Sequence, residues 1–199
     1  MIPGIDQCLA LMADEGMLAN IRDHSLVVAG IAEGIRVRLA ENGVTVPRDL
    51  VLAGALLHDI AKTHCLEESC NHARLGAEIC RERGYPEVAR IVADHVFLPR
   101  VPERADAACL VYYADKRVNH DQVVSISERE RYIIDKYGKG DRERVAAIRA
   151  NVETWRRVEE LIFNGLDLDP AALDQGFVVD ILAEAGPDCR KRAAAGGLR

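Results

Sequence analysis

Histidine and aspartate side chains interrupt three apolar stretches of this sequence. His58 and Asp59 follow the apolar residues of GALLHDIAKTH, Asp115 ends the run AACLVYYA, and His24 precedes LVVA. A carboxylate removed from water costs several kcal/mol unless a positive group holds it. Imidazole nitrogen and carboxylate oxygen are ligands that divalent cations bind. We therefore predict that these four residues meet at one divalent-metal site.

Two further histidines predict a second ion. His72 lies near the start of an expected helix, and His95 lies near the end of the next one. Asp59 could bridge two ions through its two oxygens, which leaves both histidines on the second ion; exposed surface histidines are the alternative. The expected cofactor is one or two divalent ions per chain. Mixed nitrogen and oxygen ligands favour manganese, iron, nickel, cobalt or magnesium over structural zinc.

The elements that must position these residues are expected to be helices. Glycine and proline punctuation, together with capping residues such as a Ser127-x-x-Glu130 box, divides the chain into amphipathic or apolar helical segments. Strand alternation with hairpin turns is absent, so we predict an all-α fold. The expected helices span residues 6–15, 17–41, 47–63, 69 or 71 to 84, 86–96, 102–118, 127–138 and 141–163, with a last one starting at 169.

The order of the polar residues resembles that of the HD-domain metal-dependent phosphohydrolases. The segment HDIAK is similar to the HDIG/HDIAK form of that family's signature, and the resemblance covers roughly residues 20–120. It implies an HD-domain helical bundle and hydrolysis of a phosphate ester or anhydride by metal-activated water. It also implies six metal ligands: His24, His58, Asp59, His72, His95 and Asp115.

We predict three parts in the chain. Residues 1–16 form an N-terminal helix, 17–120 the HD phosphohydrolase domain, and 121–199 a C-terminal helical extension with a frayed tail. Because no flexible linker separates the last two, we expect the extension to pack on the core. The helix at 141–163 carries an apolar stripe, which predicts packing within the chain. A homodimer contact through the C-terminal helices is the alternative.

Composition narrows the class of protein. The 199 residues are 49% hydrophobic and 29% charged, with a net charge of −6, which fits a soluble globular chain without broad nucleic-acid binding. Nothing approaches the ~18 apolar residues of a membrane span, and no secretory signal is visible. We expect a cytoplasmic protein. Its six cysteines are then reduced thiols, and a small zinc clip made by His64, Cys65, Cys70 and His72 is the alternative.

Basic residues near the expected ligands are candidates for phosphate contacts. Lys62 lies three residues after Asp59 on nearly the same helix face, and lysine also occurs there in one HD branch that this chain resembles. We expect Asp59 and Lys62 to be catalytic, with Lys62, Arg22 and Arg117 binding substrate. His64 and His120 are expected at the surface or behind the metal ligands.

The function predicted from these residues is a metal-dependent phosphohydrolase acting on a phosphorylated nucleotide or dinucleotide. Phosphomonoesterase, phosphodiesterase and dinucleoside polyphosphate hydrolase activities remain open. The first alternative is a metal-containing HD module that binds a regulatory ligand with little turnover. The second is a structural helical bundle in which core histidines are satisfied by hydrogen bonds.

Overall fold

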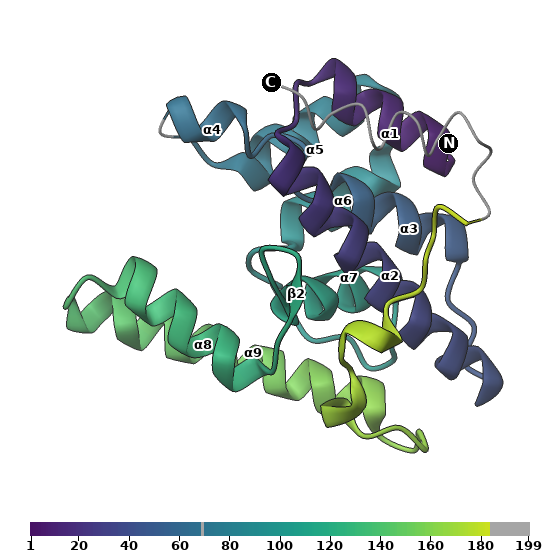
Figure 1. Cartoon of the computed structure of the whole chain (residues 1–199), viewed down its shortest axis with the longest axis vertical. Helices are drawn as coiled ribbons and strands as arrows, with labels where there is room; N and C mark the ends of the chain where they lie inside the picture. The colour runs from purple at the N-terminus through teal and green to yellow at the C-terminus, as the bar shows by residue number, and fades with distance from the viewer. Residues whose placement is uncertain (69, 184–199) are drawn as a thin grey trace.

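The structure, a computed structural model, describes residues 1–68 and 70–183, and it confirms the all-α class (Figure 1). The helices of the described residues are α1 (Ile5–Asp14), α2 (Ala19–Glu41), α3 (Arg48–Leu57), α4 (His64–Glu67), α5 (His72–Glu82), α6 (Pro86–Asp94), α7 (Ala107–Lys116), α8 (Ile126–Ile133), the π-helical turn η1 (Ile134–Gly138), α9 (Arg142–Phe163) and the 3-10 turns η2 (Pro170–Ala172) and η3 (Gln175–Phe177). A two-stranded antiparallel ribbon of β1 (Val118–Asn119) and β2 (Gln122–Val123) is the exception to the expected absence of strands.

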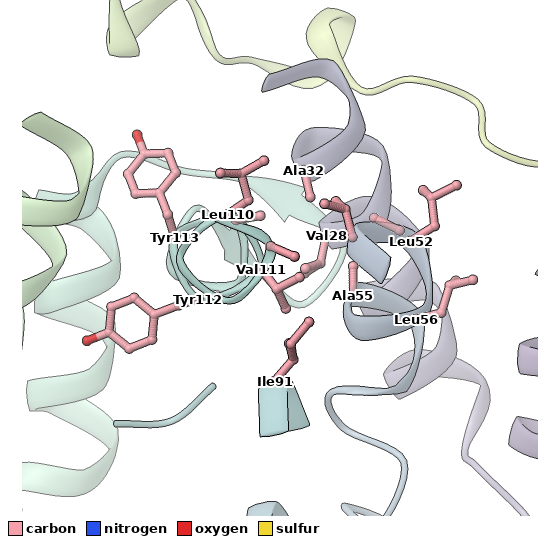
Figure 2. Packing of buried hydrophobic residues seen from close by; sticks show 14 of the residues in the cluster. Val28, Ala32, Leu52, Ala55, Leu56, Ile91, Leu110, Val111, Tyr112 and Tyr113 are labelled. Carbon is pink, nitrogen blue, oxygen red and sulfur yellow. The ribbon is translucent and has the colours of Figure 1, made fainter. Parts of the chain in front are cut away.

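Helix α7 lies at the centre of the bundle because its run of apolar residues is covered on both sides. Figure 2 shows it end-on, with Val28 of α2, Ala55 of α3 and Ile91 of α6 on one side. Tyr112 and Tyr113 point to the other side, where their hydroxyls reach α9. Burying a valine or isoleucine side chain such as Val28 or Ile91 stabilises the fold by about 1.5–3 kcal/mol. The same packing fixes the end of α7, where Asp115 lies.

Two glycines allow the helices around the polar cluster to approach closely. A Cβ atom at Gly54 would lie 2.9 Å from Ile91 Cγ2, and one at Gly76 would lie 2.9 Å from Val92 Cγ1. Glycine at these positions therefore lets α3 and α5 pack tightly on α6. The close packing brings the ends of three helices together, and those ends carry the expected metal ligands.

Several helix boundaries differ from the sequence predictions. Helix α3 ends at Leu57 instead of Thr63, and turns occupy 58–63 before the short α4. Helix α7 starts after Asp106, whose carboxylate caps it by accepting from the Cys109 amide at 2.8 Å, and not at Pro102. Asp106, and not Pro102, sets the start of α7, because its side chain satisfies an otherwise unpaired backbone donor.

The C-terminal part has two further differences. The capping box of α8 is formed by Ser125 and Glu128, not by the predicted Ser127 and Glu130. The expected helix from Asp169 is replaced by the two 3-10 turns η2 and η3. Asp169 does cap a turn there, but the chain then runs back along α2, where the Val179 amide donates to the Gly30 carbonyl at 3.3 Å.

The extension packs on the bundle through the predicted stripe of α9. Trp155, Val158 and Ile162 are buried, and α9 lies against α7. Figure 1 shows α8 and α9 side by side, reaching out to one side of the bundle. The interpretation of this stripe as packing within the chain is therefore confirmed.

The cysteine predictions are partly wrong. Cys65 and Cys70 form a disulfide, so they are not free thiols and do not form the zinc clip. Three other cysteines are buried and free, namely Cys8, Cys80 and Cys109. Cys189 and the predicted frayed tail lie outside the described residues. Within the described ranges, no helix has both the length and the apolar character needed to cross a membrane.

Candidate metal centre

The six predicted ligands come together in two adjoining clusters. His24, His58 and Asp115 form the first, while Asp59, His72 and His95 form the second. In each cluster, one ligand atom per residue lies within 4.8 Å of the others. These residues come from α2, α7, the start of α5 and the turns after α3 and α6. Each cluster could therefore hold one metal ion.

The Asp59 carboxylate lies between the two clusters. Its Oδ2 atom lies 3.4 Å from His58 Nε2 and 3.9 Å from His24 Nε2. Its Oδ1 atom lies 3.4 Å from His72 Nε2 and 3.5 Å from His95 Nε2. One oxygen thus faces each cluster. This is the arrangement that a carboxylate bridging two ions requires.

Backbone carbonyls orient three of the four imidazoles. The Nδ1 atoms of His24, His58 and His95 lie 2.7, 2.7 and 2.6 Å from the carbonyl oxygens of His120, Ala55 and Val92, respectively. A carbonyl can only accept, so Nδ1 carries the proton and donates it. The Nε2 lone pair of each ring is then directed into the cluster, as metal-ligating histidines require.

Buried atoms at the centre fit a cation. The side chains of His58 and Asp59 are 0% and 2% exposed, yet His58 Nε2 and Asp59 Oδ1 have no hydrogen-bond partner among the described residues. Leaving such atoms unpaired costs about 1–3 kcal/mol each, more when charged. A divalent ion in the first cluster would contact His58 Nε2, an ion in the second would contact Asp59 Oδ1, and each contact would remove that cost. The donor set of nitrogen and oxygen atoms suits this role.

The electrostatics of the centre favour positive charge. Burial alone would raise the pKa of Asp59, but the neighbouring His58 ring and the Lys62 ammonium hold it well below its usual value. Burial opposes protonation of His58, and the Asp59 and Asp115 carboxylates nevertheless raise its pKa. In contrast, burial lowers the pKa of His72 to about 4, so this imidazole is neutral near pH 7 and its lone pair is available.

Comparison with known proteins identifies the family. Residues 21–120 match the family model described as the HD domain. The chain belongs to the HD-domain family. This membership indicates metal-dependent hydrolase chemistry in general.

Two curated proteins are similar to parts of the chain. A tRNA (cytidine(56)-2'-O)-methyltransferase of Picrophilus torridus is 32% identical over 152 residues, which cover 68% of this chain and 41% of that protein. An uncharacterised protein of Methanocaldococcus jannaschii is 36% identical over 77 residues, or 38% of this chain and 43% of that protein. The chain thus spans less than half the length of either relative. No solved structure matches.

Two lysines of the HD domain contact the carboxylates of the centre. Lys62 Nζ donates to Asp59 Oδ2 at 2.6 Å, and its side chain is 38% exposed. Lys116 is buried, and its Nζ donates to Asp115 Oδ2 at 2.6 Å and to the His95 carbonyl at 2.8 Å. Lys62 is therefore the lysine that faces both the centre and solvent. Lys116 instead holds one ligand and the backbone of another.

The contacts of Arg117 count against the expected role of this residue in binding substrate. Its guanidinium is 3% exposed and donates to the backbone carbonyls of Val124, Pro170 and Leu173. These contacts tie the C-terminal segment to α7, so the arginine has a structural role. Arg22 forms an ion pair with Asp23 at 2.9 Å and is not among the residues described as lining the pockets beside the centre.

Two adjoining pockets open beside the centre. The larger, of about 340 Å³, is lined by the cluster residues Asp59, His72, His95 and Asp115 together with Lys62, Val96, Lys116, Arg129, Ile133, Tyr137, Ile148, Asn151 and Trp155. The smaller, of about 180 Å³, is lined by Asn20, Ile21, His24, Lys62, Leu66, His120, Arg129, Tyr132, Ile133, Lys136 and Tyr137. The extension thus forms one wall of both pockets.

Sequence reasoning did not identify the residues of this wall. Arg129, Tyr132 and Lys136 follow the 3–4 spacing of one helix face, and Tyr137 directly follows Lys136. A face that combines cations with aromatic rings was a weak signal, because solvated cations are common on a polar helix. We define these four residues as the basic ledge.

His120 supports the centre from behind, as one of its predicted roles allowed. Its carbonyl accepts a hydrogen bond from His24 Nδ1. Its φ of +55° is rare for a residue with a side chain. This left-handed conformation lies in the turn between β1 and β2. The turn therefore aims a carbonyl at a metal ligand, while the His120 ring packs on Tyr132 at 5.7 Å between centroids.

Proposed function

We propose that this protein is a metal-dependent phosphohydrolase that acts on a phosphate ester or anhydride of a nucleotide or dinucleotide. The observation that carries the proposal is the pair of clusters that share Asp59, one carboxylate oxygen facing each. His24, His58 and Asp115 would hold one divalent ion, and His72 and His95 would hold the other with Asp59.

The chemistry that such ions supply is Lewis-acid activation of water and of a phosphoryl oxygen, since a bound ion lowers the pKa of water from 15.7 toward ~7. The protein's own part is to hold the ligands. Three imidazoles are fixed through their Nδ1 protons, and the buried carboxylates stay ionised because cationic neighbours lower their pKa values. Fixed dipoles and charges of this kind need no reorganisation during a reaction.

Lys62 is suited to contact the substrate. Its ammonium donates to the carboxylate oxygen that faces the first cluster, yet the side chain remains partly exposed and lines both pockets. Negative charge develops on the phosphoryl oxygens during transfer, and a fixed cation at this point would stabilise it. Lys62 would therefore bind the scissile phosphate or order the attacking water.

The aromatic lining supports a nucleotide as the organic part of the substrate. Tyr137 lines both pockets, Tyr132 lines the smaller one, and Trp155 lines the larger one. Aromatic rings beside cations suit a planar base attached to a phosphate, because stacking and charge pairing act on neighbouring groups. A small phosphorylated molecule is accordingly the proposed partner.

The test is hydrolysis by protein loaded separately with manganese, iron, cobalt, nickel or magnesium. Candidate substrates are p-nitrophenyl phosphate, bis(p-nitrophenyl) phosphate, nucleoside monophosphates and dinucleoside polyphosphates. We expect turnover with at least one ion, loss of turnover with a chelator, and loss in Asp59→Ala. An unaltered rate in Asp59→Ala would refute the proposed mechanism.

The same variant separates the alternatives. A regulatory HD module is indicated if the wild type binds ligand without turnover and the folded Asp59→Ala variant loses that binding. A structural bundle is indicated if the wild type binds no ion and the only effect of Asp59→Ala is unfolding. Circular dichroism distinguishes the folded and unfolded variants.

A further inference from the structure

We propose that the smaller pocket is a second phosphate subsite, so that the substrate carries at least two linked phosphates. This inference rests on the proposed function, because it takes the scissile phosphate to lie at the metal centre. It narrows the substrate class to a phosphoanhydride, such as a nucleoside diphosphate or a dinucleoside polyphosphate. The 21–120 match contributes Lys62 and four other residues to the lining of this pocket, while the cations Arg129 and Lys136 lie C-terminal to the match.

The first argument is the charge of the pocket lining. Lys62, Arg129 and Lys136 line the smaller pocket, and its described lining contains no carboxylate. Lys62 and Arg129 lie near the Asp59 and Asp115 carboxylates, but Lys136 has no carboxylate partner among the described residues, so the three cations around this space of about 180 Å³ still repel one another. An anion with the size and charge of a phosphate group would relieve that repulsion.

The second argument is an unpartnered donor. Arg129 is largely buried, with a side chain 13% exposed, and its Nη1 donates to Asn119 Oδ1 at 2.6 Å. Its Nε is buried without a hydrogen-bond partner among the described residues. A guanidinium has a planar fork of donors that matches phosphate oxygens. A small shift of the Arg129 side chain would let a phosphate in the smaller pocket give this unused donor an acceptor.

The third argument is preorganisation of the basic ledge. Lys136 Nζ donates to the Tyr132 hydroxyl at 2.9 Å and lies 5.3 Å from the centroid of that ring. The Arg129 guanidinium carbon lies 5.8 Å from the same ring. Tyr132 therefore holds two cations on one helix face, which lowers the entropy lost when they bind a ligand.

The fourth argument is the position of the subsite relative to the centre. Lys62 and Arg129 line both pockets, and Arg129 Nη2 lies 3.8 Å from Asp115 Oδ1. These two cations therefore stand between the metal ligands and Lys136, which lines only the smaller pocket. A phosphate adjoining the scissile one would meet them, whereas a phosphomonoester would leave Lys136 without a contact.

The experiment compares the binding of inorganic phosphate and pyrophosphate by the full chain at constant free Mg²⁺. Trp155 is the single tryptophan and lines the larger pocket, so its fluorescence reports occupancy, with calorimetry as a second readout. We expect pyrophosphate to bind roughly tenfold more tightly than phosphate, a difference that one charge-assisted contact can supply. Lys136→Met should remove this difference while phosphate affinity stays within about twofold.

The matched control is Arg131→Met in α8, the helix that leads directly into the turn η1 where Lys136 lies. Arg131 is exposed and is not part of the described lining of either pocket, so its loss removes a cation without touching the subsite. Lys136 is also exposed, and unaltered thermal unfolding of both variants would establish that they fold. An equal decrease in pyrophosphate affinity in the two variants would be a general effect of the lost charge, and it would overturn the proposal.

Two other outcomes separate this proposal from the proposed function. Equal affinity for phosphate and pyrophosphate, together with hydrolysis of monoesters, would overturn the subsite and leave the phosphohydrolase standing. Lys136-dependent pyrophosphate binding without hydrolysis of any anhydride would support the subsite and count against the enzyme. Arg129→Met is the second variant, and it should weaken pyrophosphate binding more than Lys136→Met because Arg129 is less exposed and borders both pockets.

Discussion

The two halves of the candidate site, the metal-ligand clusters and the basic ledge, are held by different parts of the chain. Backbone carbonyls orient His24, His58 and His95 within the buried bundle. In the ledge, side chains orient other side chains, and Lys136 remains exposed. The difference separates two tasks. The bundle orients the candidate metal ligands, while the extension adds cations and aromatic rings beside them.

Lys62 joins the two halves, and its loss should have the largest effect. We expect Lys62→Met to lower turnover by roughly 10²–10³-fold, the range found when one fixed electrostatic group is removed from a reacting site. Metal content should stay unchanged because Lys62 is not a proposed ligand. Lys62→Arg should recover part of the rate. Steady-state kinetics with elemental analysis tests this, and an unchanged rate in Lys62→Met would exclude the role.

Arg117 provides a contrast with Arg129, because a buried arginine can be structural or can line a pocket. Arg117→Met would leave three backbone carbonyls without their donor. We expect a loss of about 2–4 kcal/mol in the free energy of unfolding, measured by chemical denaturation, with kcat per folded molecule preserved. A stable variant with impaired turnover would instead restore Arg117 to the substrate site.

The metal ligands could be predicted from the sequence, whereas the ledge could not. His58 and Asp59 are polar residues inside an apolar run, and burial restricts what can hold them. Arg129 and Lys136 lie on a polar helix where solvated cations are expected, so their types carry little information. Only the packing of α8 and α9 shows that they face the centre. The prediction for Arg117 failed to anticipate its structural contacts, since two of its partners are the backbone carbonyls of Pro170 and Leu173, more than 50 residues further along the chain.

The turn at His120 tests whether the bundle orients its ligands through the backbone. His120→Gly keeps access to the left-handed conformation and keeps the carbonyl that accepts from His24. We expect its metal content to match the wild type. His120→Val should cost about 1–2 kcal/mol in stability and weaken metal binding, because a β-branched residue is strained at that φ. Similar metal content in both variants would contradict this account.

The smallest expected effect lies far from both halves, at Glu33. Burial alone would raise its pKa, but ion pairs with Arg36 at 2.7 Å and Arg48 at 2.9 Å lower it. Since the folded pKa lies below the unfolded one, this contribution to stability is present above about pH 4.5 and is lost as the pH falls. Below that pH, the unfolding free energy of Glu33→Gln should decrease less than that of the wild type, and the difference should be about 1 kcal/mol or less. An unchanged acid profile would contradict it.

The most direct test of the central claim is the number of metal ions per chain, measured by elemental analysis in the wild type and in His72→Ala. The account predicts two ions in the wild type and one in the variant, because His72 belongs to only one of the clusters that share Asp59. His64→Ala is the matched control, since His64 pairs with Glu15 outside both clusters and its loss should leave two ions bound. A wild-type chain that binds no ion after reloading with manganese or iron would contradict the account, since nothing would then explain the unpartnered atoms of His58 and Asp59.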